Sequence, residues 1–326
     1  MLRYTGKRLL QMVFVLLGVS FIIFCLMEIT PGDPARQILG PDASEEAVLA
    51  MREELRLDDP FAVRYISYIA GVLHGDFGTS YTTKEPVIHE LFARYPTTVL
   101  FAVLTVLIAS LIGIPLGIIS ATKQYSWVDS LSTSFAMLGV SIPTFWLGLM
   151  LMLLFSVKLE WLPATGFYGP IYWILPAITV GLPASAGIIR MTRSSMLEVV
   201  RLDYIRTARA KGQTERKIIY GHALENAMIP VITVVGITFG QSLGGQIVTE
   251  QVFAVPGLGK LMVEAINSRN YPVVEGGVLL IAFAYCVINL LVDIIYAYLD
   301  PRIKSQYSSS VKKRMKKEAA AHEGES

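Results

Sequence analysis

The chain has 326 residues, of which 53% are hydrophobic and only 17% are charged, and its net charge is +2. Soluble domains carry about 25% charged residues, so this composition excludes an ordinary soluble domain and predicts a protein that lipid surrounds. The two cysteines, Cys25 and Cys286, both lie in apolar segments, which excludes a disulfide framework and a cysteine metal site.

Residues 1–29 predict a cytosolic end followed by a first transmembrane helix. Arg3, Lys7 and Arg8 precede an apolar run at 9–27. A cleavable secretory signal has an apolar region of about 7–15 residues and a small-residue cleavage site. This run is longer and lacks such a site, so we expect a retained span.

The segment 30–96 is polar and rich in acids, which predicts an external location. Apolar residues recur at helical spacing on both sides of Pro60, so two amphipathic helices are expected there. They are Val48, Met51 and Leu55 before it, and Phe61, Tyr65, Tyr68, Ile69 and Val72 after it. These helices either pack on the external membrane surface or help to form a platform for a substrate-binding protein.

The part 97–304 predicts five more spans and a cytosolic loop, giving an all-α polytopic membrane protein with six transmembrane helices. The spans are expected at 97–121, 131–157, 173–189, 227–248 and 276–299. Gly113 and Gly117 form a GxxxG pattern that predicts close helix packing, and Pro143 predicts a bend or break.

Six spans place both termini in the cytosol, together with the basic segment 190–225, and place the acidic segment 30–96 outside. This arrangement satisfies the positive-inside rule, and the inverted one would violate it at both termini and at the basic loop. The basic tail 305–326 is expected to be disordered and cytosolic.

The segment 190–225 is strongly basic and separates two spans. Apolar residues at helical spacing precede Gly212, which offers a left-handed helix stop, and Thr214 can cap a second short helix. The apolar residues are Leu197, Val200, Tyr204 and Ala208. A helix, a glycine and a second helix predict a rigid cytosolic knob, although charge alone also fits an ordinary basic loop.

The pattern TARAKG at 207–212, followed by HALxNAxIP at 222–230, resembles the cytoplasmic coupling loop of ABC-importer permeases of the dipeptide/oligopeptide/nickel branch. Five further motifs match that branch in order. They are TPGDP at 30–34, GDFGTS at 75–80, VFAVPGLG at 252–259, YPVV at 271–274 and LDPR at 299–302. Arg206 occupies the family's glutamate position and Glu225 its final proline position, so no salt bridge of that glutamate is carried over.

The resemblance covers about residues 1–304 and implies a type I ABC importer permease. Such a subunit pairs in the cell membrane with a second homologous permease, two cytosolic ATPases and an external substrate-binding protein. The branch transports dipeptides and oligopeptides, and also glutathione or nickel complexes. The resemblance implies coupling through 203–212, with Tyr204, Ala208 and Gly212 in a groove of the ATPase, and Arg206 and Arg209 at its rim.

Catalytic motifs are missing from the sequence. Gly259-Lys260 lacks both the serine or threonine and the first glycine of a phosphate loop, and His89-Glu90 lacks the second histidine of a zinc protease helix. We therefore expect no enzymatic activity, cofactor or metal. The alternative function is a self-contained secondary carrier or channel.

Asp293 is the one clearly intramembrane acid, on a helical face with Asn289. Such residues are functional candidates, and a proton-relay role stays open. We favour a structural ion pair with Arg190 or Arg193.

A polar stripe in the fifth span predicts the translocation path. Its members share one helical face: Thr238, Gln241, Ser242, Gly245 and Thr249. Polar side chains do not face hydrocarbon, so this stripe faces water or protein. Simple interhelical packing is the alternative, because Gly236, Gly240 and Gly244 form an adjacent ridge of small residues.

Overall fold

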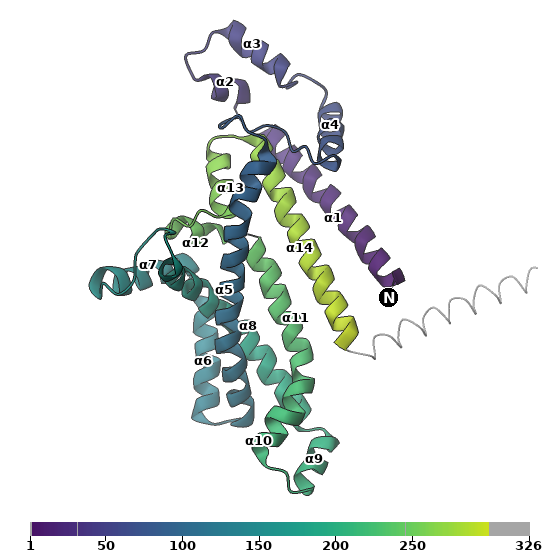
Figure 1. Cartoon of the computed structure of the whole chain (residues 1–326), viewed down its shortest axis with the longest axis vertical. Coiled ribbons are helices and arrows are strands. Elements are labelled where there is room, and N and C mark those ends of the chain that lie inside the picture. The colour runs from purple at the N-terminus through teal and green to yellow at the C-terminus, as the bar shows by residue number, and fades with distance from the viewer. Residues whose placement is uncertain (1, 31, 245, 300–326) are drawn as a thin grey trace, which may run out of the picture.

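The computed structural model describes residues 2–30, 32–244 and 246–299, and within them every regular element is helical. Figure 1 shows long helices side by side, with α2, α3, α4 and α13 at one end and α9 and α10 at the other. The predicted tail at 305–326 and Gly245 lie outside the described residues. The elements are α1 (Leu2–Ile29), α2 (Pro34–Leu39), α3 (Glu45–Glu54), α4 (Phe61–Leu73), α5 (Val87–Thr122), α6 (Trp127–Ser141), α7 (Thr144–Met152), η1 (Leu153–Lys158), η2 (Pro170–Trp173), α8 (Ile174–Val200), α9 (Asp203–Ala210), α10 (Glu215–Lys217), η3 (Ile218–Ala223), α11 (Leu224–Leu243), α12 (Ile247–Val252), α13 (Leu258–Asn267) and α14 (Tyr271–Leu299).

Five continuous helical segments in the described part of the chain are long and apolar enough to cross a membrane. They are Thr5–Ile29, Val87–Thr122, Pro170–Val200, Glu215–Leu243 and Tyr271–Ile295. The sixth candidate is the pair Trp127–Ser141 and Thr144–Lys158, bent by 100° at its break. Ile142, the residue before Pro143, adopts an extended conformation that ends α6. The predicted break at Pro143 is therefore confirmed.

Several predicted boundaries do not coincide with helix ends: two fall inside helices, and one lies beyond the end of a helix. Helix α5 begins at Val87 and includes Pro96, so the boundary at 96 falls inside a helix. Helix α8 runs to Val200, so the segment 190–225 begins as a helix and not as a loop. Helix α11 ends at Leu243, five residues before the predicted end of the fifth span.

The two predicted amphipathic helices of the external segment are present as α3 and α4. Aromatic residues of α4 pack against α1: the Tyr65 ring lies 5.4 Å from that of Phe21 and 5.5 Å from that of Phe24. The Tyr65 hydroxyl also lies 2.9 Å from Ser20 Oγ. Helix α2 was not predicted, although Asp33 caps it by accepting a bond from Ala35 N.

The VFAVPGLG motif folds around a buried carboxylate that joins α12, α13 and α5. Glu250 is fully buried, accepts a bond from Lys260 N at 2.9 Å and lies 3.2 Å from Thr98 Oγ1 of α5. Thr98 Oγ1 in turn accepts from Leu258 N at 2.7 Å. Burial raises the pKa of Glu250, while these bonds oppose that rise.

Helices α5 and α8 pack closely along their length, and glycines permit this contact. A Cβ at Gly113 would lie 2.7 Å from Ile188 Cβ, and one at Gly117 would lie 2.5 Å from Thr192 Cβ and 2.9 Å from the Ile189 carbonyl oxygen. The predicted GxxxG packing is confirmed. The second ridge of glycines packs on α14, where Gly236 faces Val292 and Gly240 faces Tyr285.

We predict that Gly117→Ala lowers the thermal midpoint of the purified protein, because the new methyl overlaps the Ile189 backbone oxygen, which cannot rotate away. Overpacking of this kind costs about 1–3 kcal/mol. Gly187→Ala on α8 is the matched control, since its Cβ would meet nothing within 4 Å. Equal thermal midpoints for the two variants would contradict the proposed contact.

Candidate coupling and translocation sites

The short helix α9 is held to the long helices by one buried side chain. Ile205 is fully buried in an apolar cluster that joins five elements at this end of the molecule. Its other members are Ile118 and Ala121 of α5, Met196 and Val199 of α8, Ile218 and Ala223 of η3, and Ala227 of α11. Ile205 therefore places α9 in direct contact with the cluster shared by α5, α8 and α11.

The predicted continuous helical face from Leu197 to Ala208 is interrupted. Helix α8 ends at Val200 and α9 begins at Asp203, so a turn at Arg201 and Leu202 separates them. Ile205 therefore provides the main anchor, while Ala208 is only partly buried against the same cluster. The sequence did not reveal Ile205, because the predicted helical spacing continued from Leu197 to Ala208 without the turn at Arg201 and Leu202. On that spacing Ile205 lies outside the apolar face.

The polar side of α9 is exposed. Tyr204 is 42% exposed, and its hydroxyl accepts a bond from Asn226 Nδ2 at 2.9 Å. Arg206 lies 3.6 Å from Asp203, and both side chains are exposed. Arg209 makes two bonds to Glu215, of 2.7 and 3.2 Å, and this carboxylate raises the pKa of the guanidinium. This side combines one aromatic ring with two cations.

Gly212 ends this region in the left-handed conformation that its sequence predicts, with φ of 76°. An added Cβ would meet nothing within 4 Å, so the restriction here is backbone strain and not space. Thr214 occupies the N-cap position of α10, but its side chain makes no capping bond. The predicted second helix is present, with η3 continuing it toward α11.

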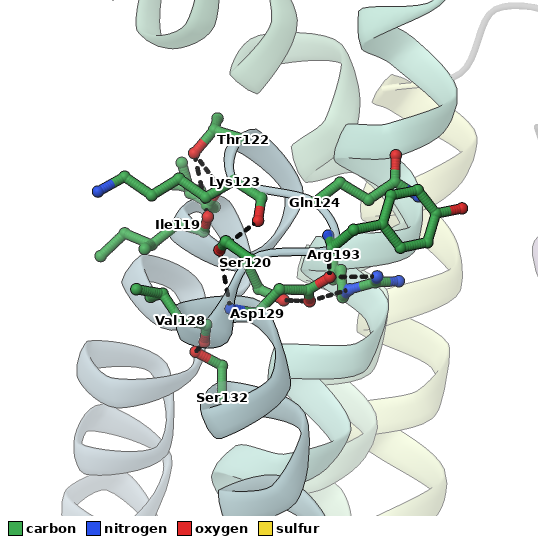
Figure 2. Close-up of polar contacts among 12 residues, drawn as sticks. Ile119, Ser120, Thr122, Lys123, Gln124, Val128, Asp129, Ser132 and Arg193 are labelled. Carbon is green, nitrogen blue, oxygen red and sulfur yellow. Dashed lines mark hydrogen bonds and ion pairs between the residues drawn. The ribbon is translucent and has the colours of Figure 1, made fainter.

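An ion pair fastens the α5–α6 hairpin to α8 near the same end (Figure 2). Arg193 Nε and Nη2 donate to the two Asp129 oxygens at 2.8 and 2.9 Å. Asp129 also accepts bonds from Ser120 Oγ and from Tyr125 N, and its side chain is only 7% exposed. All of these groups face the carboxylate, so its charge is fully compensated.

The expected partner of Asp293 was wrong. Arg193 is engaged by Asp129, and Asp293 instead pairs with Arg8 of α1 at 3.0 Å. A structural ion pair is therefore present, but it joins α14 to α1, the helix nearest the N-terminus. Sequence separation concealed this partner, because residues 8 and 293 are 285 positions apart.

The predicted polar stripe does not form one continuous helical face. Thr238, Gln241 and Ser242 lie on α11, whereas Thr249 lies on α12, beyond the helix end at Leu243. Gln241 is exposed, while Ser242 and Thr249 are buried. Gly245, the fifth member, lies outside the described residues.

The segment between α11 and α12 carries a polar contact that the sequence did not indicate. Gln246 Nε2 donates to Thr105 Oγ1 of α5 at 3.2 Å, and Gln246 Oε1 is buried without a partner in the described part of the chain. An interrupted helix at membrane depth is tolerated where it lines a cavity or is covered by protein.

Two sequence profiles match the chain. The profile described as "Binding-protein-dependent transport system inner membrane component" matches residues 113–305. The N-terminal component of the same type of transport system matches residues 1–102. The chain belongs to the binding-protein-dependent transport permeases.

Similar permeases match over almost the full length. The dipeptide transport system permease protein DppB of Alkalihalophilus pseudofirmus is 43% identical, covering 93% of this chain and 100% of that protein. The glutathione transport system permease protein GsiC is 43% identical in Salmonella typhimurium and 41% identical in Escherichia coli K12, each covering 93% of this chain and 99% of the relative. The family is one of transport subunits and not of enzymes.

The fold is that of type I ABC importer permeases. An inward-facing structure of the MetNI methionine ABC transporter matches with a TM-score of 0.55 at 20% identity, covering 64% of this chain and 96% of the other. This permease is therefore a multi-pass inner membrane protein that functions with ATPase and substrate-binding partners. Nothing in these comparisons favours the self-contained carrier or channel.

We predict that Asp129→Asn destabilises the permease by about 2 kcal/mol, because it leaves the Arg193 charge unpaired. This is less than the 3–5 kcal/mol typical of a fully buried pair, since the Arg193 side chain is 29% exposed. Thermal denaturation of the purified permease measures the loss. The exposed acid Asp203 is the control, and Asp203→Asn should change the midpoint little.

The double variant Asp129→Asn/Arg193→Gln tests the cause, because it removes both charges. It should be more stable than Asp129→Asn alone. A double variant that loses the sum of both single effects would show that the two residues act independently.

Proposed function

We propose that this permease forms half of the translocation path of an ATP-driven peptide importer. The other half is a second homologous permease, and two cytosolic ATPases and an external binding protein complete the transporter. The dipeptide relative, which is matched from end to end, supports peptides as the solute. Glutathione is itself a short peptide, so the glutathione relatives fit the same class.

Both termini and α9 lie on the cytosolic side in this proposal. The basic residues of α9 and α10 support this orientation, since cytosolic segments carry an excess of lysine and arginine. Helices α2, α3 and α4 then lie outside, at the end of the molecule opposite to α9 (Figure 1). There they provide a surface for the binding protein.

The observation that carries the proposed coupling role is the burial of Ile205 beneath the exposed side of α9. Tyr204, Arg206 and Arg209 face outward for an ATPase, while Ile205 faces the cluster of α5, α8, η3 and α11. Closure of the ATPases on ATP would move α9, and the long helices would follow. Shifting a two-state equilibrium from 1:99 to 99:1 takes about 5.5 kcal/mol of differential binding, which nucleotide can supply.

The proposed translocation path follows the end of α11 and the start of α12. Thr238 and Gln241 offer neutral hydrogen-bond donors and acceptors. Such groups suit the passage of polar peptides that differ in their side chains. Ser242 and Thr249 are buried in this conformation, so they reach the path only when the helices rearrange. In the sequence, Gly245 falls between these two pairs of residues, outside the described part of the chain.

We predict that Gly212→Val leaves the transporter assembled but uncouples peptide uptake from ATP hydrolysis. A β-branched residue at φ of 76° costs about 1–3 kcal/mol and would alter the end of α9. Uptake of a labelled dipeptide and phosphate release are measured in the same proteoliposomes, with binding protein present. Full coupled uptake by the valine variant would contradict the proposal.

Gly212→Asn is the matched control, because asparagine tolerates the left-handed conformation. It is similar in size to valine, and the site has open space around the Cβ position. It should retain most of the coupled uptake. If both variants lose uptake equally, side-chain bulk and not backbone conformation is responsible.

We predict that single cysteines at 238 and 241 react with a water-soluble thiol reagent, in a background where Cys25 and Cys286 are replaced. Cysteines at 242 and 249 should react only when nucleotide changes the conformation, because both positions are buried here. Positions 235 and 239, which pack against apolar clusters, serve as controls. If cysteines at all four positions remain unreactive both with and without ATP, the translocation path does not pass along this part of the chain.

A further inference from the structure

A cavity of about 200 Å³ opens between the external segment and the first turn of α14. Its walls come from α1, from the end of α3 through α4, and from the loop before α5. The residues that line it include Phe24, Arg56, Asp59, Arg64, Ser67, Tyr81, Tyr271 and Glu275. None of them belongs to the proposed coupling helix or to the polar residues of α11.

Glu275 presents a buried carboxylate to this cavity. The residue is 8% exposed, and its carboxylate has no hydrogen bond or ion pair within the described part of the chain. The Tyr271 hydroxyl, one turn earlier on α14, is likewise buried without a partner there. Buried polar groups are normally satisfied, so two such groups at one cavity point to a ligand.

The wall that carries Tyr81 is fixed to α14. Asn270, which directly precedes α14, accepts a bond from Tyr81 N at 3.0 Å and donates to Ser80 Oγ at 2.8 Å. The Tyr81 and Tyr271 rings lie 6.5 Å apart. Burial raises the pKa of Tyr81 to about 12, so its hydroxyl remains protonated at neutral pH. The aromatic side of the cavity is therefore preorganised.

No arginine pairs with the Glu275 carboxyl group in the described part of the chain. Arg64 donates to Glu28 at 2.8 Å and to the Leu57 carbonyl at 3.3 Å, and its guanidinium lies 5.7 Å from the Phe24 ring centroid. Arg56 is exposed at the rim, near Asp59 in the sequence. The cavity thus has an acid at its base and a guanidinium at its rim.

This arrangement selects an organic zwitterion over a metal ion. Hard cations require several oxygen ligands, and the described residues contain no group of three or more acids, histidines or cysteines that could hold a metal. An ammonium group needs one carboxylate and favours aromatic rings. A cavity of about 200 Å³ is smaller than the usual 300–1,000 Å³ of drug-sized sites, so it accommodates only one end of an extended solute.

We propose that this cavity binds the ammonium end of a zwitterionic amino acid or short peptide, with Glu275 accepting from the ammonium and Arg56 facing the carboxylate. The identity of the solute rests on the proposed peptide function, whereas the existence of the site does not. The position is external, so a solute here would occupy the permease before it enters the path along α11.

Protection of a single cysteine tests the site without requiring transport. Ser67→Cys places an exposed thiol at the cavity, in the assembled transporter with Cys25 and Cys286 replaced. Modification by a water-soluble maleimide is measured against increasing L-alanyl-L-alanine. We expect the dipeptide to slow modification, and N-acetyl-L-alanyl-L-alanine, which lacks the ammonium, to require about tenfold or more higher concentration.

Glu275→Gln should produce the same loss of protection by the dipeptide. Glu85→Gln is the control, because Glu85 is an exposed acid of the external segment that does not line the cavity. Equal protection by the acetylated dipeptide, or no protection by either compound, would overturn the site. The comparison of the dipeptide with its N-acetyl derivative uses a protein that keeps Glu275. The site can therefore be tested even if the Glu275→Gln variant fails to assemble.

Two further measurements separate the explanations. Protection by substrate-free binding protein, with none from the dipeptide, would also overturn the proposal, because the cavity would then be covered by the docked protein and not occupied by the dipeptide. Dipeptide uptake with binding protein and ATP is assayed in parallel. Absent uptake with intact protection contradicts the proposed peptide function alone, whereas intact uptake without protection contradicts only this site.

Discussion

The end of the permease that carries α9 depends on the burial of Ile205. Helix α9 has only eight residues, and isolated helices of this length are unstable in water. Its position therefore derives from the apolar cluster that holds Ile205 between α5, α8, η3 and α11. Because the cluster is closely packed, moving α9 away from the long helices would expose buried apolar surface. That mechanical continuity is what a coupling element requires.

Charge has a different role at the same end. The bidentate pair of Arg193 and Asp129 joins the α5–α6 hairpin to α8, and Arg8 with Asp293 joins α1 to α14. Between apolar helices in lipid there is little hydrophobic driving force, so close contacts and polar pairs set the arrangement. Glycines on α5 and α11 supply the close contacts, and these two ion pairs fix which helices are neighbours.

The sequence predicted what depends on short-range pattern. The apolar runs predicted the transmembrane spans, and Pro143 predicted the break between α6 and α7. Gly113 and Gly117 predicted the close α5–α8 contact, and Gly212 predicted a residue in the left-handed conformation. The partner of Asp293 and the role of Ile205 were missed because both depend on residues brought together by the fold. The stripe from Thr238 to Thr249 failed as one helical face because helical spacing cannot reveal a helix end at Leu243.

The buried acid Glu250 illustrates how one group restricts the residues around it. Its carboxyl occupies the space that a side chain at residue 257 or 259 would fill, so glycine is required at both positions by volume. Neither glycine can therefore gain a side chain while the glutamate at 250 is present. During evolution a larger residue at 257 becomes acceptable only after the acid at 250 has been shortened, which fixes the order of the substitutions. The motif at 252–259 and this acid outside it should therefore be inherited as one unit.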